Sequence, residues 1–246
     1  VSGGGLPTPM AAKSARAEMM VADAAPSPEA AGESHAYRLP GTGDLPDGSL
    51  QRLPLVDAAR GIACERRYEL GQAGLGWTPS QPIIDRNFNG DGGERPVAVR
   101  LAFRNRGTGL GLPLPAGRLR VAEGDALLGE AMIGHVPAGG GVDVALGTAF
   151  DLTATRSRSA FELDRAGRSM TETVEFTVRN AKAGAATVRI HEPMPRWSDW
   201  EIVSTTVQPG ERDAQSAWFD LAVPAGGEAR LTYTVRYRWA PDVRID

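Results

Sequence analysis

Residues 97–104 read Val-Ala-Val-Arg-Leu-Ala-Phe-Arg, with a large apolar side chain at every second position. Side chains of a β-strand point alternately to its two faces, so a repeat of two residues predicts a half-buried strand. The same repeat returns near the end of the chain, over residues 174–178, 188–190, 219–223 and 231–239. Turn-forming pairs such as Pro209-Gly210 separate these stretches. The sequence therefore predicts an all-β protein.

Composition and length favour two β domains in tandem. The 246 residues include 30 Gly and 18 Pro, which suits many short strands joined by tight turns. We expect an immunoglobulin- or fibronectin-like sandwich at 156–246, because its strands follow one another at hairpin spacing. A second antiparallel, sandwich-like β domain is expected at 35–155. The polar segment from Thr155 to Arg168 is expected to be a connection or an exposed edge strand.

The first part of the chain has a different composition. Residues 1–34 are rich in Gly, Ala, Ser and Pro and hold few large apolar side chains, which predicts a flexible linker largely without a core. No apolar run is long enough to span a bilayer. Because the chain starts at Val1 rather than Met, we expect it to be the C-terminal portion of a longer protein.

Charge and cysteine content narrow the classes of partner. The net charge of −3 and the pI near 5.7 give no overall attraction to nucleic acid or to an anionic membrane. Cys64 is the only cysteine, so the chain can form neither an internal disulfide nor a thiolate metal cluster. We expect Cys64 to be a small buried apolar residue in a strand.

One loop has the composition of a calcium site. Residues 85–92 read Asp-Arg-Asn-Phe-Asn-Gly-Asp-Gly, which places side-chain oxygens at alternate positions before a glycine. The candidate ligands are Asp85, Asn87, Asn89 and Asp91. However, Pro96 stands where an EF-hand loop carries its bidentate Glu. The same residue types form ordinary exposed loops, so a plain turn remains the alternative.

A group of aromatic and acidic residues suggests a sugar-binding surface. Trp197 and Trp200 could stack on sugar rings while the carboxylates of Asp199, Glu192 and Glu201 accept hydrogen bonds from hydroxyl groups. The alternative is structural, because sandwiches of this size commonly bury a tryptophan between their sheets.

A basic stretch without acidic residues runs between Glu94 and Glu123. Its alternation places four arginines on solvent faces, namely Arg100, Arg104, Arg118 and Arg120. These side chains form one basic stripe if their strands pair, and such a stripe could bind an anionic polysaccharide or an acidic partner. The alternative is a solvated face without a ligand.

No set of catalytic residues can be identified in the sequence. The three histidines, His35, His135 and His191, are far apart, and no anchored nucleophile accompanies them. Since nucleophile, base and orienting residue cannot be named together, we expect no enzyme and no cofactor.

Several turn-and-strand motifs together resemble a known family. They are Leu39-Pro40-Gly41 with Pro46-Asp47-Gly48, the stretch 109–121, Gly147-Thr148-Ala149-Phe150-Asp151-Leu152, the stretch 172–180, and Pro224-Ala225-Gly226-Gly227-Glu228. In this order they resemble the C-terminal domain of bacterial mucoidy-inhibitor-type proteins. The resemblance implies an exported protein of the periplasm or cell surface, with an N-terminal β domain and a coiled coil upstream. It also implies some link to surface polysaccharide, and it brings no catalytic residues.

We therefore expect a non-enzymatic structural or interaction module that binds a protein partner, associates with itself or contacts surface polysaccharide. The alternative function is a carbohydrate-binding or carbohydrate-active protein that uses the region from Trp197 to Glu201.

Overall fold

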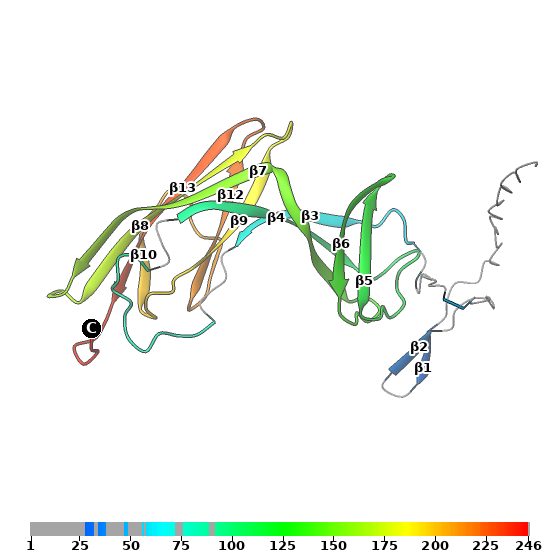
Figure 1. The fold of residues 1–246 in the computed structure, drawn as a ribbon, viewed down its shortest axis with the longest axis horizontal. Helices are drawn as coiled ribbons and strands as arrows, with labels where there is room; N and C mark the ends of the chain where they lie inside the picture. The colour runs from blue at the N-terminus through cyan, green and yellow to red at the C-terminus, as the bar shows by residue number, and fades with distance from the viewer. Residues whose placement is uncertain are drawn as a thin grey trace, which may run out of the picture. The chain divides into compact units, whose positions relative to one another are not determined.

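The computed structural model describes residues 28–31, 34–37, 47–48, 56, 58–71, 76–88 and 92–245. They belong to two compact units, Val1–Ala59 and Arg60–Asp246. In the first unit, β1 (Pro28–Ala31) pairs antiparallel with β2 (Ser34–Tyr37) (Figure 1). Part of the predicted linker thus forms a hairpin strand, and the rest of residues 1–34 lies outside the described ranges, apart from Ser34 in β2.

The second unit consists of strands joined by turns and loops. Its strands are β3 (Cys64–Gly71), β4 (Gly92–Arg104), β5 (Gly117–Glu123), β6 (Ala126–Ile133), β7 (Gly141–Asp164), β8 (Ser169–Asn180), β9 (Ala186–Pro193), β10 (Trp200–Thr205), β11 (Glu211–Arg212), β12 (Ser216–Val223) and β13 (Glu228–Arg238). No described residue is helical, so the all-β prediction is confirmed for this part of the chain. It follows that no described helix could span a membrane.

Most strands join one large sheet, in the order β10-β13-β8-β7-β4-β3-β9-β12-β11. Neighbouring strands are antiparallel except β3 and β9, which run parallel from Tyr68↔Val188 to Gly71↔His191. The sheet is therefore mixed, whereas the sequence predicted antiparallel pairing only. β5 and β6 form a separate two-stranded sheet.

The sheet folds back on itself around its main core. Phe219 of β12 and Tyr233 of β13 stack with ring centroids 5.6 Å apart, although these strands are not neighbours in the sheet. Both side chains are at most 1% exposed. The two ends of the sheet thus face each other across apolar side chains, which is the packing of a β-sandwich.

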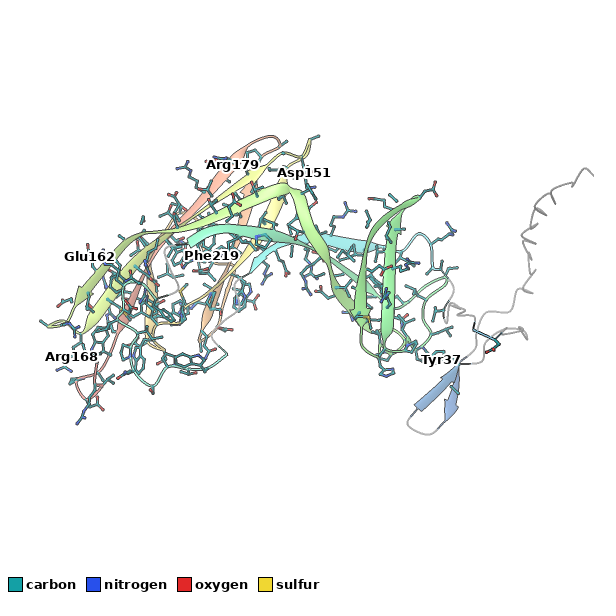
Figure 2. All side chains as sticks on the ribbon, viewed as in Figure 1. Tyr37, Asp151, Glu162, Arg168, Arg179 and Phe219 are labelled. Carbon is teal, nitrogen blue, oxygen red and sulfur yellow. The ribbon has the colours of Figure 1, made fainter. Side chains whose placement is uncertain are left out.

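A second, smaller core lies farther along the same strands. Leu101 of β4 and Val142 and Val144 of β7 pack there against side chains of β5 and β6. Strands β4 and β7 contribute to both cores, and Figure 2 shows Asp151 at the bend of β7 between them. The smaller core is therefore built within an insertion between strands of the main core.

β7 contains a segment that was expected to be a connection or an exposed edge strand, Thr155 to Arg168. Its residues up to Asp164 belong to the strand. Residues 155–157 pair with both β4 and β8, whereas in the described chain residues 158–164 pair with β8 alone, as in an edge strand. The sheet is consequently continuous across the predicted domain boundary at residues 155 and 156. The polar appearance of this strand has a physical reason, because Arg156 is buried in an ion pair described below.

Candidate functional site

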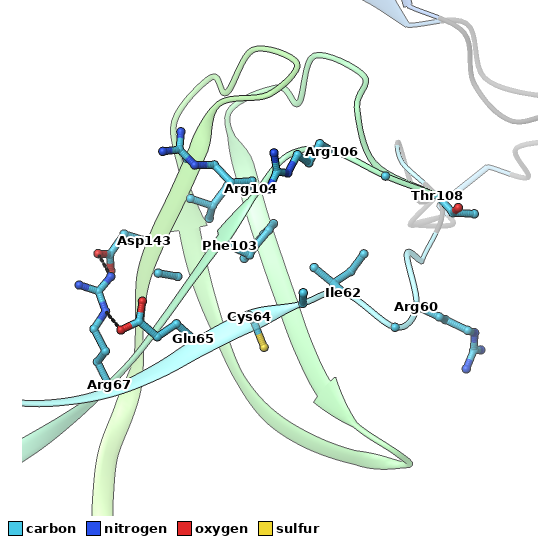
Figure 3. A pocket seen from close by; sticks show the side chains of 16 residues that line it. Arg60, Ile62, Cys64, Glu65, Arg67, Phe103, Arg104, Arg106, Thr108 and Asp143 are labelled. Atoms are coloured by element: carbon cyan, nitrogen blue, oxygen red, sulfur yellow. Dashed lines mark hydrogen bonds and ion pairs between the residues drawn. The ribbon is translucent and has the colours of Figure 1, made fainter. Parts of the chain in front are cut away.

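An open groove of about 1020 Å³ lies beside the ends of β3, β4 and β7 that carry the smaller core (Figure 3). Its charged lining residues are Arg60, Glu65, Arg67, Arg104, Arg106 and Asp143. We call this feature the arginine groove. The lining thus contains four basic and two acidic side chains, although the whole chain carries a net charge of −3.

The two acidic residues of the arginine groove are already paired. Arg67 Nη2 lies 2.7 Å from Asp143 Oδ2, and Arg67 Nε lies 3.8 Å from Glu65 Oε1. No ion pair to another described residue is found for Arg60, Arg104 or Arg106. The groove therefore presents guanidinium groups whose charge is not compensated by the described neighbours.

Asn105 positions two of these arginines. This residue follows β4, is fully buried and lies between Arg104 and Arg106. Its Nδ2 donates hydrogen bonds to the carbonyl oxygens of Leu112 (2.7 Å) and Pro137 (3.0 Å). Its backbone is also hydrogen-bonded to Gly139 and Gly140. One buried side chain thus ties together the loops that follow β4 and β6 and fixes the end of the groove.

The arginine groove also adjoins an open strand edge. One edge of β3 pairs with β4 from Cys64 to Glu69. The other edge pairs with β9, but only from Tyr68 onward. Within the described chain, the stretch Cys64–Arg66 therefore has no strand on its second side, and all three of its residues are exposed. Cys64 is exposed in the groove, which corrects the expectation of a buried cysteine.

The predicted basic stripe does not form as one surface. β5 pairs with β6 rather than with β4, so Arg118 and Arg120 lie in a different sheet from Arg100 and Arg104. Arg118 and Arg120 both donate hydrogen bonds to Glu130, at 3.0 and 2.6 Å. Arg100 pairs with Asp143 and Glu69. Of the four arginines, the structure places only Arg104 in the arginine groove.

The predicted calcium loop is described only in part. Asn89 and Asp91 lie outside the described residues. Asp85 Oδ1 accepts a hydrogen bond from the backbone N–H of Asn87 at 2.9 Å, which is a local turn. No group of three or more His, Cys, Asp or Glu residues that could hold a metal ion occurs in the described ranges.

The two tryptophans of the predicted sugar surface lie against the main core. Trp200 is 7% exposed, and its indole N–H donates to the carbonyl oxygen of Ala214 at 2.8 Å. Trp197 is half-buried and packs against the same core. Glu201 accepts hydrogen bonds from Arg236 and Arg238. The ring of Trp200 is therefore not available for stacking on a sugar.

The densest cluster of ionisable groups is buried in the sandwich. The sequence suggested one member, Glu192, as part of the sugar surface, but the structure buries this residue at 1% exposure. Glu192 Oε1 accepts hydrogen bonds from Arg156 Nε (3.0 Å), Arg156 Nη2 (2.6 Å) and Tyr233 OH (2.8 Å). Burial raises the pKa of Glu192, with Arg156 and Tyr233 acting in the opposite sense. Burial opposes the charge of Arg156, but its attraction to Glu192 and the hydrogen bond outweigh this and raise its pKa.

A second buried pair lies beside the first. Arg196 Nε donates to Glu172 Oε2 at 2.9 Å, and Arg196 Nη1 donates to the carbonyl oxygens of Ile83 and Asp85. The guanidinium of Arg196 also lies 4.7 Å from the ring centroid of Phe161. These contacts hold the loop before β4 onto the sandwich. Arg156, Glu172, Glu192 and Arg196 are each at most 8% exposed, so the cluster is closed to a substrate.

The two-residue repeat of β8 and β9 indicates that both acidic residues, Glu172 and Glu192, are buried. Glu172 is in phase with the buried Val174 and Phe176 of β8, and Glu192 is in phase with the buried Val188 and Ile190 of β9. An acidic residue on an apolar strand face predicts a buried partner of opposite charge.

Comparison with protein-family models, with curated proteins and with solved structures finds no match to this chain. The resemblance to mucoidy-inhibitor-type proteins consequently stays a prediction.

Proposed function

We propose that this chain is a non-enzymatic interaction module and that the arginine groove binds an acidic ligand. The observation that carries the proposal is the set of three groove arginines, Arg60, Arg104 and Arg106, whose charges have no ion-pair partner among the described residues. Guanidinium groups hold carboxylates through paired hydrogen bonds. They stay protonated at neutral pH, so they bind anions without exchanging protons.

The local field supports the same assignment. The groove carries an excess of arginine on a chain that is acidic overall, so it is a local surface that attracts anions. Such attraction between solvent-exposed charges weakens with salt, because the screening length is about 10 Å at 0.1 M ionic strength. Binding at the arginine groove is thus expected to be selective for acidic ligands and sensitive to ionic strength.

The family resemblance adds the setting of this proposal. A mucoidy-inhibitor-type protein would be exported to the periplasm or cell surface, where both acidic proteins and anionic surface polysaccharide are possible ligands. An immunoglobulin-like fold of the C-terminal sandwich also belongs to this proposal, and the main hydrophobic core of the second unit is the feature that supports it.

Binding of fluorescent poly-glutamate, followed by anisotropy at low and high salt, tests the proposal. The Arg104→Gln/Arg106→Gln variant is expected to lose most of the binding. Arg118→Gln/Arg120→Gln removes the same charge from exposed positions outside the groove and is expected to bind like the wild type. Equal binding by the two variants, or binding by neither the wild type nor the control, would refute the proposal.

A further inference from the structure

We propose that the acidic ligand is an extended peptide segment that adds as a strand to the open edge of β3. This inference rests on the proposed function, because it takes the arginine groove as the binding site and names the class of ligand. Its structural basis is the combination of three features, namely the stretch Cys64–Arg66, whose second edge has no described strand beside it, the adjoining groove and the arginines without a described ion-pair partner.

The edge has the geometry that strand addition requires. The first pair between β3 and β9 is Tyr68↔Val188, and the described strand β9 begins two residues earlier, at Ala186. No described strand continues β9 in this direction, alongside the beginning of β3. A peptide would lie there, next to Cys64–Arg66, and extend the sheet by main-chain hydrogen bonds.

The arginines determine the character of the incoming peptide. Main-chain hydrogen bonds give affinity without sequence preference, and side chains at alternate positions give selectivity. Arg104 and Arg106 flank the groove on the β4 side, and Arg60 lies just before β3. Because β3 lies between β4 and the open edge, the proposal requires the long side chains of Arg104 and Arg106 to reach across β3 to glutamate or aspartate at every second position of the peptide. The fitting partner is therefore an acidic segment with a strand-like repeat.

A competing explanation is that the charged residues keep other chains away from the edge. Proteins often place charged residues on exposed strand edges to prevent association with other chains. This explanation predicts that no peptide binds along the edge. Charge attraction alone predicts that an acidic polysaccharide binds as well as an acidic peptide. Strand addition differs from both because it depends on peptide N–H groups at alternate positions.

Cys64 supplies a built-in reporter for the test. It is the only cysteine of the chain, it is exposed, and it lines the groove at the open edge. The rate of its alkylation by a maleimide is measured with a synthetic peptide that has glutamate at alternate positions. Two further versions of this peptide carry N-methyl groups on either the odd or the even backbone amides. An oligomer of a uronic acid serves as the non-peptide anion.

The expected result is protection by the unmodified peptide and by only one of the two methylated peptides, since a strand presents alternate N–H groups to each side. At a peptide concentration of about ten times Kd, alkylation should slow by about tenfold. Equal effects of the two methylations, or protection by the uronic acid alone, would overturn strand addition and leave an acidic ligand at the groove standing. Absence of protection by every anion, together with no poly-glutamate binding, would overturn both proposals.

Discussion

Replacing Arg156 by methionine tests how the buried ion pair supports the sandwich. Methionine keeps much of the side-chain volume but removes the charge and both hydrogen bonds to Glu192 Oε1. Glu192, which is 1% exposed, then stays in the core with only the hydroxyl of Tyr233 as a donor. Breaking a buried pair from one side costs about 3–5 kcal/mol in other proteins.

Protonation limits this cost here. An unfolded Glu has a pKa of about 4.3, so taking up a proton at pH 7 costs at most about 3.7 kcal/mol. The free energy of unfolding of the variant should thus fall by about 3 to 4 kcal/mol at pH 7. For a chain of this size that corresponds to a decrease in Tm of roughly 6–15 °C. At pH 5 the same calculation limits the fall in the free energy of unfolding to about 1 kcal/mol, because this pH is close to the pKa of an unfolded Glu.

The assay is thermal and urea unfolding, monitored by circular dichroism, at pH 5 and pH 7. Arg118→Met is the matched control, because Arg118 pairs with Glu130 on an exposed face, where ion pairs contribute little. The variant should lose much more stability than the control at pH 7 and approach it at pH 5. An Arg156→Met protein that unfolds like the wild type at pH 7, or that shows the same loss at both pH values, would refute the reasoning.

Three other substitutions test separate contacts. Tyr233→Phe removes a hydrogen bond to charged Glu192 and should lower the free energy of unfolding by about 1.5–3 kcal/mol, measured by urea unfolding. Gly92→Ala should prevent normal pairing of β4 with β7, because its Cβ would lie 1.8 Å from a carbonyl oxygen; Gly93→Ala, also at positive φ but with open space, should lower Tm less. Asn105→Ala leaves the carbonyl oxygens of Leu112 and Pro137 without their donor, so the free energy of unfolding should fall by about 1–3 kcal/mol and poly-glutamate binding should be lost. Retained binding would show that other contacts hold these loops in place.

The repeat of two residues was sufficient to predict many of the strands. Residues 97–104 lie within β4, and most of 231–239 lies within β13. This works because one face of each strand is buried, and burial imposes the alternation. The repeat says nothing about which strands pair, so the parallel contact of β3 with β9 could not be predicted. It was ambiguous for the second half of β7, where buried Arg156 has the polarity of a surface residue but a buried acidic partner.

The candidate site was predictable only in fragments. Arg104 was singled out as part of a basic stripe, but its actual neighbours in the groove are Arg60 and Arg106, which the stripe did not include. Two of these arginines belong to loops or turns, where no period fixes the direction of a side chain. Cys64 was expected to be buried because a strand cysteine usually is, but its end of β3 extends beyond the pairing with β9.

Two asparagines show how the fold and the groove depend on each other. Asn105 follows Arg104 at the end of β4, and Asn180 follows Arg179 at the end of β8. Both are buried, and each donates through Nδ2 to carbonyl oxygens of neighbouring loops. An Arg-Asn pair at the end of an alternating strand therefore has one structural role at two places. At the first place the role also sets the groove, because Asn105 lies between two of its arginines. An Arg104 variant therefore tests the charge of the groove only if Asn105 keeps its hydrogen bonds to the loops that follow β4 and β6.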